Sequence, residues 1–253
     1  NNTPMPTTPS WEIDYGASFK HGYILASALQ PFAEANILPR FAKVFEQTYI
    51  RFLDLQKAEA QAREAKIEMA LEKIRSRTMA MQHSDELPEA ANLLFLEVQA
   101  LGIPSWSAGY NILADDKKSS MCWMSSKGHM QSGFKLRFTD SGEPSFAAWL
   151  EAIEKGQSFF VQELGGKAIE DHYNFMRTLP EVGPVLQELE DAGLSLPTYQ
   201  INHLSFFNGG FLLFITYEPV PDAHDIFRRF TKVFEQTYTR FKKKKKAEAQ
   251  ARE

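Results

Sequence analysis

The chain has 253 residues, of which 43% are hydrophobic, and a formal net charge of −4 at pH 7. This length and composition suit one or two globular domains, and the mixed charges argue against a surface for nucleic acid or anionic membranes. The single cysteine, Cys122, excludes an intramolecular disulfide framework and fits a reducing compartment. The longest apolar run, Gly210–Tyr217, is far shorter than the roughly 20 residues that span a bilayer. We therefore expect a cytoplasmic segment without membrane contact.

The N-terminal part is expected to fold as a β-hairpin followed by one long helix. Residues 10–30 are typical of two short strands around a turn at residues 20–22. No glycine or proline interrupts residues 41–81, so a continuous helix of about 60 Å is expected there. An apolar stripe with helical spacing follows this helix, and its members are Phe41, Phe45, Phe52, Leu55, Ile67, Leu71 and Ile74.

This stripe is too narrow for such a long helix to bury itself alone, so a partner helix is expected. We predict a parallel homodimeric coiled coil with the stripe as its seam; the alternative is a helix that packs on its own domain. Between the two halves of the stripe the seam thins to alanines, at Ala58, Ala62 and Ala65. A weakly packed stretch of this kind can hold two helix arrangements of similar energy.

The rest of the chain alternates short helices with short strands. A capping residue, Ser84, begins a helix that Gly102 ends. Period-two alternation and turn residues predict strands at 106–113, 119–125, 133–138, 157–163, 199–207 and 210–217. Helical spacing predicts helices at 145–155, 167–177, 181–192 and 230–253. Because tight turns join most strands, the predicted fold class is α+β with a largely antiparallel sheet.

One segment of the chain occurs twice. Residues 41–64 return at 230–253 with 18 of 24 positions identical. The match continues upstream through paired positions such as Pro9 and Pro197, Trp11 and Tyr199, Phe19 and Phe207, and Gly22 and Gly210. A repeat this long is a whole domain rather than a solenoid unit. The chain is therefore expected to hold the end of one module followed by one complete module.

The repeat divides the chain into four expected regions. These are the hairpin remnant of a preceding module at 1–40, a coiled-coil linker helix at 41–83, a complete domain at 84–229 and a closing signalling helix at 230–253. The second helix carries lysines at 242–245 where the first carries Leu53–Gln56. Since leucines are lost from the seam and adjacent like charges are added, this helix is expected to fray from Lys242.

The order of elements resembles a GAF domain, in which a helix, about six antiparallel strands, helices inserted within the sheet sequence and a closing helix follow one another. Residues 41–64 and the segment IEMALEKIRSRTMAMQHSDELPEA at 67–90 resemble linkers between GAF-like modules of bacterial sensor histidine kinases. The resemblance implies a GAF-like antiparallel sheet with flanking helices and long linker helices. It also implies a sensory input domain that relays a signal to an output domain elsewhere in the protein.

The sequence departs from two well-known GAF types and carries no enzyme motif. The asparagine-lysine-phenylalanine-aspartate-glutamate signature of cyclic-nucleotide-binding members is absent, and no Cys-His pair matches the bilin attachment site. Glycine-rich phosphate loops and the Gly-x-Ser-x-Gly elbow are also missing, and the six histidines lack metal-ligand spacing. We therefore predict no catalytic residue, no metal site and no cofactor, and expect this segment not to be an enzyme.

A ligand pocket would be lined by aromatic side chains with a few polar anchors. The candidates are Tyr110, Trp123, Trp149, Tyr199 and His203. Trp106, Ala108, Tyr110 and Ile112 are expected on one strand face, as are Tyr199, Ile201 and His203 on another. The alternative is that the aromatic residues form the core and that His203 is a structural histidine.

Two functions fit these features. The first is a regulatory sensor module that binds a small molecule or a partner and acts as a homodimer through its linker helices, in a bacterial signalling protein such as a histidine kinase. The second is a ligand-free module that serves only for dimerisation and spacing.

Overall fold

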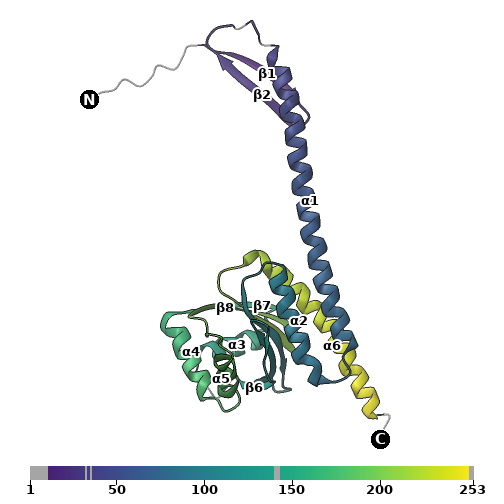
Figure 1. Ribbon diagram of the computed structural model, residues 1–253, viewed down its shortest axis with the longest axis vertical. Helices are drawn as coiled ribbons and strands as arrows, with labels where there is room; N and C mark the ends of the chain where they lie inside the picture. The colour runs from purple at the N-terminus through teal and green to yellow at the C-terminus, as the bar shows by residue number, and fades with distance from the viewer. Residues whose placement is uncertain (1–10, 32, 35, 140–142, 251–253) are drawn as a thin grey trace, which may run out of the picture. The chain divides into compact units, whose positions relative to one another are not determined.

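The computed structural model describes residues 11–31, 33–34, 36–139 and 143–250 (Figure 1). The chain divides into two compact units, residues 1–65 and residues 66–253. The boundary lies inside the longest helix, α1 (Ile37–Ala80), so each unit contains part of this helix. The linker helix expected at 41–83 is therefore shared between the two units rather than forming a region of its own.

The first unit is the expected hairpin together with the first part of α1. Strands β1 (Ile13–Phe19) and β2 (Gly22–Ala28) pair antiparallel as a two-stranded sheet. The rings of Phe19 and Phe45 lie 5.2 Å apart, edge to face. The backbone N–H of Lys20 donates to Glu46 Oε1 at 2.9 Å. These contacts fix the hairpin turn against the side of α1.

The second unit contains an antiparallel sheet of seven strands. Their order is β5-β4-β3-β9-β8-β7, with β6 also paired to β4. A two-residue turn links the last two strands, and Gly209 there takes a φ of 107°, which glycine adopts without steric cost. The bounds are β3 (Ser105–Leu113), β4 (Ser119–Ser126), β5 (His129–Met130), β6 (Phe134–Arg137), β7 (Phe159–Gly165), β8 (Tyr199–Phe207) and β9 (Gly210–Thr216).

Helices cover both faces of this sheet (Figure 1). One face carries the end of α1 together with α2 (Leu87–Ala100), which the short turn η1 (Ser84–Glu86) precedes, and α6 (His224–Gln250), which η2 (Pro221–Ala223) precedes. The other face carries α3 (Pro144–Glu154), α4 (Gly166–Thr178) and α5 (Gly183–Asp191). The predicted α+β class is confirmed; the sheet has seven strands rather than about six because the two-residue strand β5 escapes pattern analysis.

The first hydrophobic core lies between the sheet and the helices α1, α2 and α6. Tyr110 of β3 stacks on Phe234 of α6 with ring centroids 4.1 Å apart. Three members of the expected dimer seam, Ile67, Leu71 and Ile74, belong to this core and are only 5%, 3% and 1% exposed. They have almost no surface left for a partner helix, so this half of the stripe packs on its own domain.

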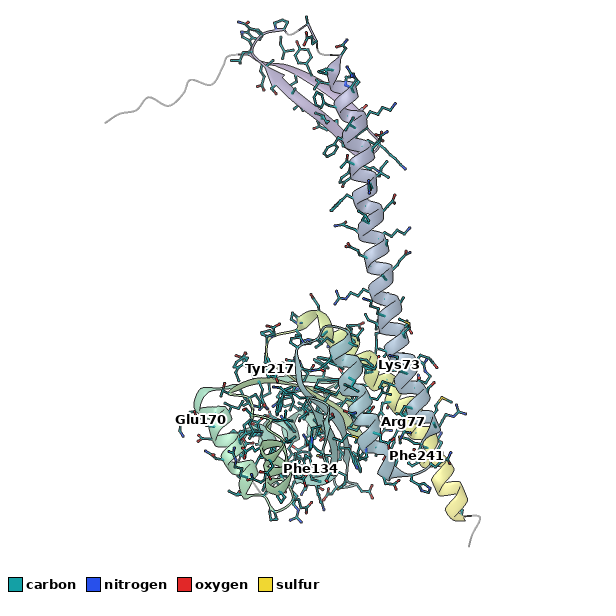
Figure 2. All side chains as sticks on the ribbon, in the orientation of Figure 1. Lys73, Arg77, Phe134, Glu170, Tyr217 and Phe241 are labelled. Carbon is teal, nitrogen blue, oxygen red and sulfur yellow. The ribbon has the colours of Figure 1, made fainter. Side chains whose placement is uncertain are left out.

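Charged side chains join α1 to the turn and helix that follow it (Figure 2). Arg77 contacts Glu86 at 3.0 Å and Glu89 at 2.7 Å, and Lys73 contacts Glu97 at 2.7 Å. Glu86 also accepts the backbone N–H groups of residues 82 and 83, and these bonds, followed by the one from Arg77, lower its pKa to about 2. The contacts orient the α1–α2 corner, although each exposed pair contributes little stability.

The closing helix is part of the domain rather than a separate region. The buried side chains Phe230, Phe234 and Phe241 belong to the first core. The helix begins at His224 rather than at the expected residue 230. In the structure α6 continues as a helix to Gln250, past the lysines from which it was expected to fray or splay. Lysine, alanine, glutamate and glutamine are all good helix formers, and this intrinsic preference accounts for the continuation.

Candidate ligand pocket

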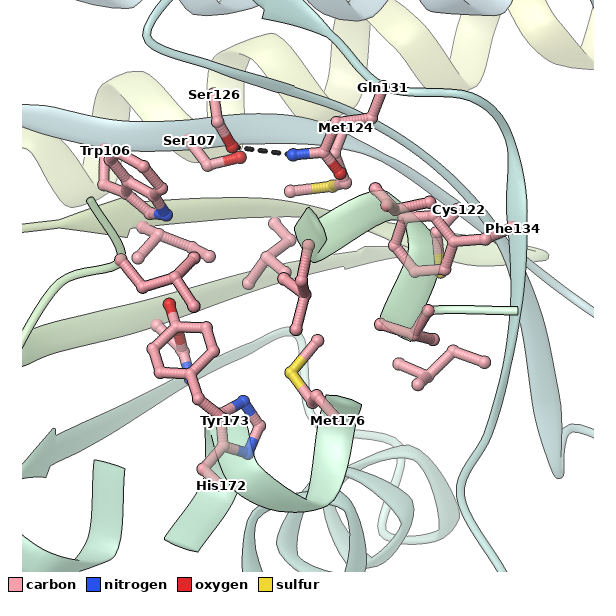
Figure 3. A pocket seen from close by; sticks show the side chains of 18 of the residues that line it. Trp106, Ser107, Cys122, Met124, Ser126, Gln131, Phe134, His172, Tyr173 and Met176 are labelled. Atoms are coloured by element: carbon pink, nitrogen blue, oxygen red, sulfur yellow. Dashed lines mark hydrogen bonds between the residues drawn. The ribbon is translucent and has the colours of Figure 1, made fainter. Parts of the chain in front are cut away.

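A cavity of about 70 Å³ lies in the second unit, between the sheet and the helices α3, α4 and α5 (Figure 3). Its floor comes from alternate residues of the central strands, with Cys122 and Met124 from β4 and Leu213 and Ile215 from β9. Its roof comes from the apolar faces of α4 and α5. The cavity is therefore lined mainly by residues of the second hydrophobic core and belongs to the second unit alone.

A β-bulge adds a large aromatic side chain to the pocket. The register between β3 and β9 shifts between Ser105 and Ser107. Since a bulge re-aims the side chain beside it, Trp106 faces the pocket, whereas Ala108 and Tyr110 lie in the opposite core. The expectation that Trp106 shares a face with these residues is wrong for this reason.

Four hydrogen bonds form a chain along one side of the pocket. The Tyr173 hydroxyl donates to Gln200 Oε1 at 2.6 Å, and Gln200 Nε2 donates to Asn202 Oδ1 at 3.0 Å. Asn202 Nδ2 and Trp149 Nε1 both donate to Gln162 Oε1, at 3.3 and 2.8 Å. Burial raises the pKa of the Tyr173 phenol, although Trp106 opposes this shift, and the group remains a neutral donor. The chain offers amide groups that can exchange partners with a bound molecule.

A buried ionisable pair closes the roof. His172 Nδ1 lies 3.1 Å from Glu143 Oε1, and both side chains are almost fully buried. Burial alone raises the pKa of Glu143, but the hydrogen bond and charge of His172 outweigh it, with help from the backbone N–H of Phe146, and the pKa is lowered. Because Glu143 is the N-cap of α3 and accepts from Phe146 at 3.0 Å, the pair holds the start of α3 against α4.

Neutral polar groups line the pocket beside strands β3 and β4. Gln131 Nε2 donates to Ser126 Oγ at 2.7 Å, as the dashed line in Figure 3 shows. Ser107 Oγ donates to the backbone carbonyl of Ser125 at 2.9 Å. Cys122 also lines the pocket. Burial raises the pKa of its thiol to about 12, so the group remains a thiol at neutral pH and does not act as a nucleophile.

Among the residues that the structure describes, the pocket lining includes no lysine or arginine. Anionic ligands such as phosphates and carboxylates are bound most strongly by charge-assisted hydrogen bonds from these side chains. The lining instead combines aliphatic, aromatic and amide groups, which suit a small neutral molecule with one polar end.

The structure separates the five predicted ligand residues. Only Trp149 lines the pocket. Tyr110 and His203 lie on the opposite face of the sheet, against α2 and α6, and Trp123 packs against that same core. Tyr199 is half-buried at the end of β8, outside the lining.

Sequence analysis missed the polar residues that form the pocket. Gln200 and Asn202 alternate with Ile201 and His203 along β8, and it is the amide pair that faces the cavity. Two amide side chains at alternate positions of a largely apolar strand were the available signal, since a buried polar group needs a partner.

His203 occupies a distinct environment on the other face. Its Nε2 lies 2.9 Å from Thr216 Oγ1, whereas Nδ1 is buried without a hydrogen-bond partner among the residues that the structure describes. Burial, and then the nearby charge of His224, lowers the pKa of His203 to about 4. The imidazole is therefore neutral at pH 7 and acts as part of the core.

The described part of the chain shows neither a metal centre nor a membrane span. Within residues 11–250, apart from the gaps given above, no group of three or more His, Cys, Asp or Glu side chains is placed to hold a metal ion. Over the same residues, no helix is both long and apolar enough to cross a bilayer.

The chain is similar to solved structures but not to a known sequence family. No family model matches the sequence, and no curated protein matches it. Among solved structures, a chain described as "Structure of the GAF domain" is similar over 69% of this chain and 88% of its own length, with 11% identity and a TM-score of 0.40. The order expected of a GAF-like domain, with antiparallel strands, helices inserted before the last hairpin and a closing helix, is the order that the structure has.

Proposed function

We propose that residues 66–253 form a GAF-like regulatory sensor module that binds a small neutral molecule in the pocket between the sheet and α3–α5. The observation that carries this proposal is the chain of buried amide and hydroxyl groups along an otherwise apolar cavity. These groups satisfy one another in the structure, and a ligand with an amide or hydroxyl group can replace one bond of the chain without leaving a polar atom unpaired.

The size of the cavity sets how binding would act. An apolar cavity of about 150 Å³ holds benzene, whereas this one measures about 70 Å³. A ring-sized ligand therefore has to move part of the roof. The proposed moving part is α4 and α5, because they contribute Met176, Val185 and Leu186 to the lining and follow one another in the chain.

The sheet connects the pocket to the helices on its other face. In β9, Leu213 and Ile215 border the pocket side, while Leu212 and Phe214 lie in the opposite core. Phe214 stacks on Phe227 of α6 with ring centroids 4.1 Å apart. We propose that a shift of the sheet caused by ligand binding reaches α6 and the end of α1 through these contacts.

We also propose that two chains pair through their α1 helices. With Ile67, Leu71 and Ile74 engaged in their own domain, the exposed face of α1 that remains for a partner is the stripe of Leu55, Ala58, Ala62, Ala65 and Met69. Spacings of three and four suit a parallel helix pair. The resemblance of the linker segments further supports a place in a bacterial signalling protein with an output domain, such as a histidine kinase.

A matched set of three ring compounds tests the ligand proposal. Benzamide, benzoate and benzylammonium share a ring and differ in charge. Benzamide is expected to raise the midpoint of thermal unfolding, by the equivalent of about 1.4 kcal/mol at ten times its Kd. Benzoate and benzylammonium are expected to have less effect, because the lining residues that the structure describes include no lysine or arginine and their one histidine, His172, is already paired with Glu143.

A pocket-filling variant provides the control. Val185→Phe places extra volume in the cavity and is expected to abolish the benzamide shift. Val161→Phe makes the same change on an exposed side chain of β7 and should keep it. If benzamide shifted the unfolding midpoint equally in both variants, it would bind outside this pocket.

The small volume of the cavity favours one alternative, a ligand-free module that serves only for dimerisation and as a spacer. Ligand sites are usually about 300–1,000 Å³, well above the about 70 Å³ seen here. This alternative predicts that none of the three compounds, nor any neutral analogue of similar size, raises the unfolding midpoint.

A further inference from the structure

The two copies of the internal repeat differ sharply in burial. Phe41 and Phe45 in the first unit are 57% and 48% exposed, whereas their counterparts Phe230 and Phe234 are 0% exposed. Val44 is 62% exposed, although it matches a buried valine in the second copy. The same side chains on the same helix face are therefore covered in one module and uncovered in the other.

The second unit shows what covers this face. Phe234 contacts Tyr110 of β3, and its cluster includes Ile74 of α1 and Leu94 of α2. Thr237 Oγ1 accepts a hydrogen bond from Thr78 Oγ1 at 2.8 Å. The cover thus consists of three elements from the first half of the module: the end of α1, α2 and β3.

Among the described residues, the hairpin of the first unit also has no counterpart of strand β3 beside it. In the second unit, β9 pairs with β8 on one side and with β3 on the other. Its counterpart β2 pairs with β1 alone among the described residues, in a two-stranded sheet. An open edge beside an exposed apolar face is a ready surface for a further strand and helix.

We propose that this surface of the first unit, made by the β2 edge with Phe41, Val44, Phe45 and Phe52, binds the first half of another module of this kind. The occupant presents a helix with a stripe like Ile67–Ile74, a second helix like α2, and a strand that pairs antiparallel with β2. It is carried on the same polypeptide, ahead of Pro9.

The repeat itself argues for this source. The correspondence between the copies extends upstream of the hairpin, pairing Trp11 with Tyr199 and Pro9 with Pro197. The chain therefore enters both hairpins through similar residues, and in the second unit the segment that enters the hairpin comes from the half-module that covers it. The proposal also reassigns Phe41, Phe45 and Phe52 from a seam between two chains to the core of a preceding module.

The first test uses the 253-residue chain, followed by backbone hydrogen exchange. With the surface uncovered, amides of β1 and β2 are expected to exchange at least about 100-fold faster than those of β8 and β9. Strong protection of β1 and β2 that disappears on dilution would mean that a second copy occupies the surface. Protection that persists on dilution would mean that the chain covers the surface itself. Either result overturns the proposal.

The second test adds to the chain a second copy of the segment that is proposed to cover the surface. A second copy of residues 66–196 is fused directly ahead of Pro9, so that the junction reproduces the native Leu196-Pro197 connection. Exchange in β1 and β2 is expected to slow by on the order of 100-fold relative to the 253-residue chain. Unchanged exchange in a fused chain whose β8 and β9 remain protected would overturn the proposal.

Variants within the fused copy separate specific packing from simple proximity. Leu71→Asp with Ile74→Asp breaks the covering stripe and is expected to remove the new protection. Ser76→Asp, on the exposed face of the same helix, should retain it. Loss of protection in all variants alike would contradict the proposed mode of binding.

Discussion

At the residue scale, Glu143 and His172 form the buried ionisable pair that borders the pocket roof. Glu143→Gln keeps the shape but removes the charge and one acceptor, so we expect a loss of about 1–3 kcal/mol of folding free energy at pH 7. Because the folded protein lowers the pKa of Glu143, the stabilisation by its carboxylate is present above the ordinary pKa and is lost as the pH falls through the lowered value. Urea unfolding at several pH values measures both effects.

An exposed glutamate provides the control for this prediction. Glu151 makes only a surface pair with Lys155, and Glu151→Gln is expected to change the free energy of unfolding by no more than about 0.5 kcal/mol. If Glu143→Gln costs no more than Glu151→Gln, the pair does not hold the roof of the pocket.

His203 predicts a second dependence on pH. The folded protein keeps its imidazole neutral, with a pKa of about 4, whereas the unfolded chain binds a proton near pH 6.5. Stability is therefore expected to fall by about 3 kcal/mol as the pH drops from about 6.5 to about 4. His203→Leu should remove this part of the acid destabilisation, and the same change at the half-buried His129 of β5 should leave it intact. Identical pH profiles for wild type and His203→Leu would contradict the burial argument.

The residue scale is also where sequence reasoning failed, for a physical reason. Alternation along β8 correctly grouped His203 with Ile201 and separated both from Gln200 and Asn202. However, helices cover both faces of this sheet, so hydrophobicity does not mark which face is the interior. If the wrong face of the sheet is taken to line the pocket, every candidate ligand residue on a strand is displaced by one position. That choice sent Tyr110 and His203 to the pocket and left out the amide pair.

At the element scale, the repeat provides two matched phenylalanines in different surroundings. Phe234→Ala removes a fully buried ring and is expected to lower the free energy of unfolding of the second unit by about 3–5 kcal/mol. Phe45→Ala changes a half-exposed ring in the first unit, so the unfolding of the second unit should stay within about 0.5 kcal/mol of wild type. Tryptophan fluorescence during urea unfolding reports the second unit, since Trp106 and Trp149 lie in its core. Equal losses for the two variants would mean that Phe45 is buried in solution.

Most elements could be predicted from local patterns, because their boundaries carry strong local signals. Pro144 and Gly156 bracket α3, and Gly209 marks the last hairpin. The end of α1 shows what such patterns lack: Ile67, Leu71 and Ile74 have helical spacing whether they face another chain or their own sheet. Only the packing distinguishes these cases, because the partner surface includes α6, which is distant in sequence.

At the scale of the whole molecule, the alanine-rich part of α1 is expected to control how two chains pair. Replacing Ala58, Ala62 and Ala65 by leucine adds apolar area to the exposed stripe, and the dimer dissociation constant should fall at least about tenfold. Ala60→Leu lies off the stripe and should leave it unchanged. Analytical ultracentrifugation measures both variants. Equal dissociation constants for the two variants would contradict the proposed pairing, and unchanged signalling output from the triple variant would contradict a role in relay.

We propose above that the pocket is a ligand site coupled to the helices on the opposite face of the sheet. The most direct measurement is hydrogen exchange of the 253-residue chain with and without saturating benzamide. We expect altered exchange in α4 and α5, where the roof moves, together with altered exchange in α6 and in residues 66–80 of α1. No change in any of these helices, or a change confined to α4 and α5, would contradict it.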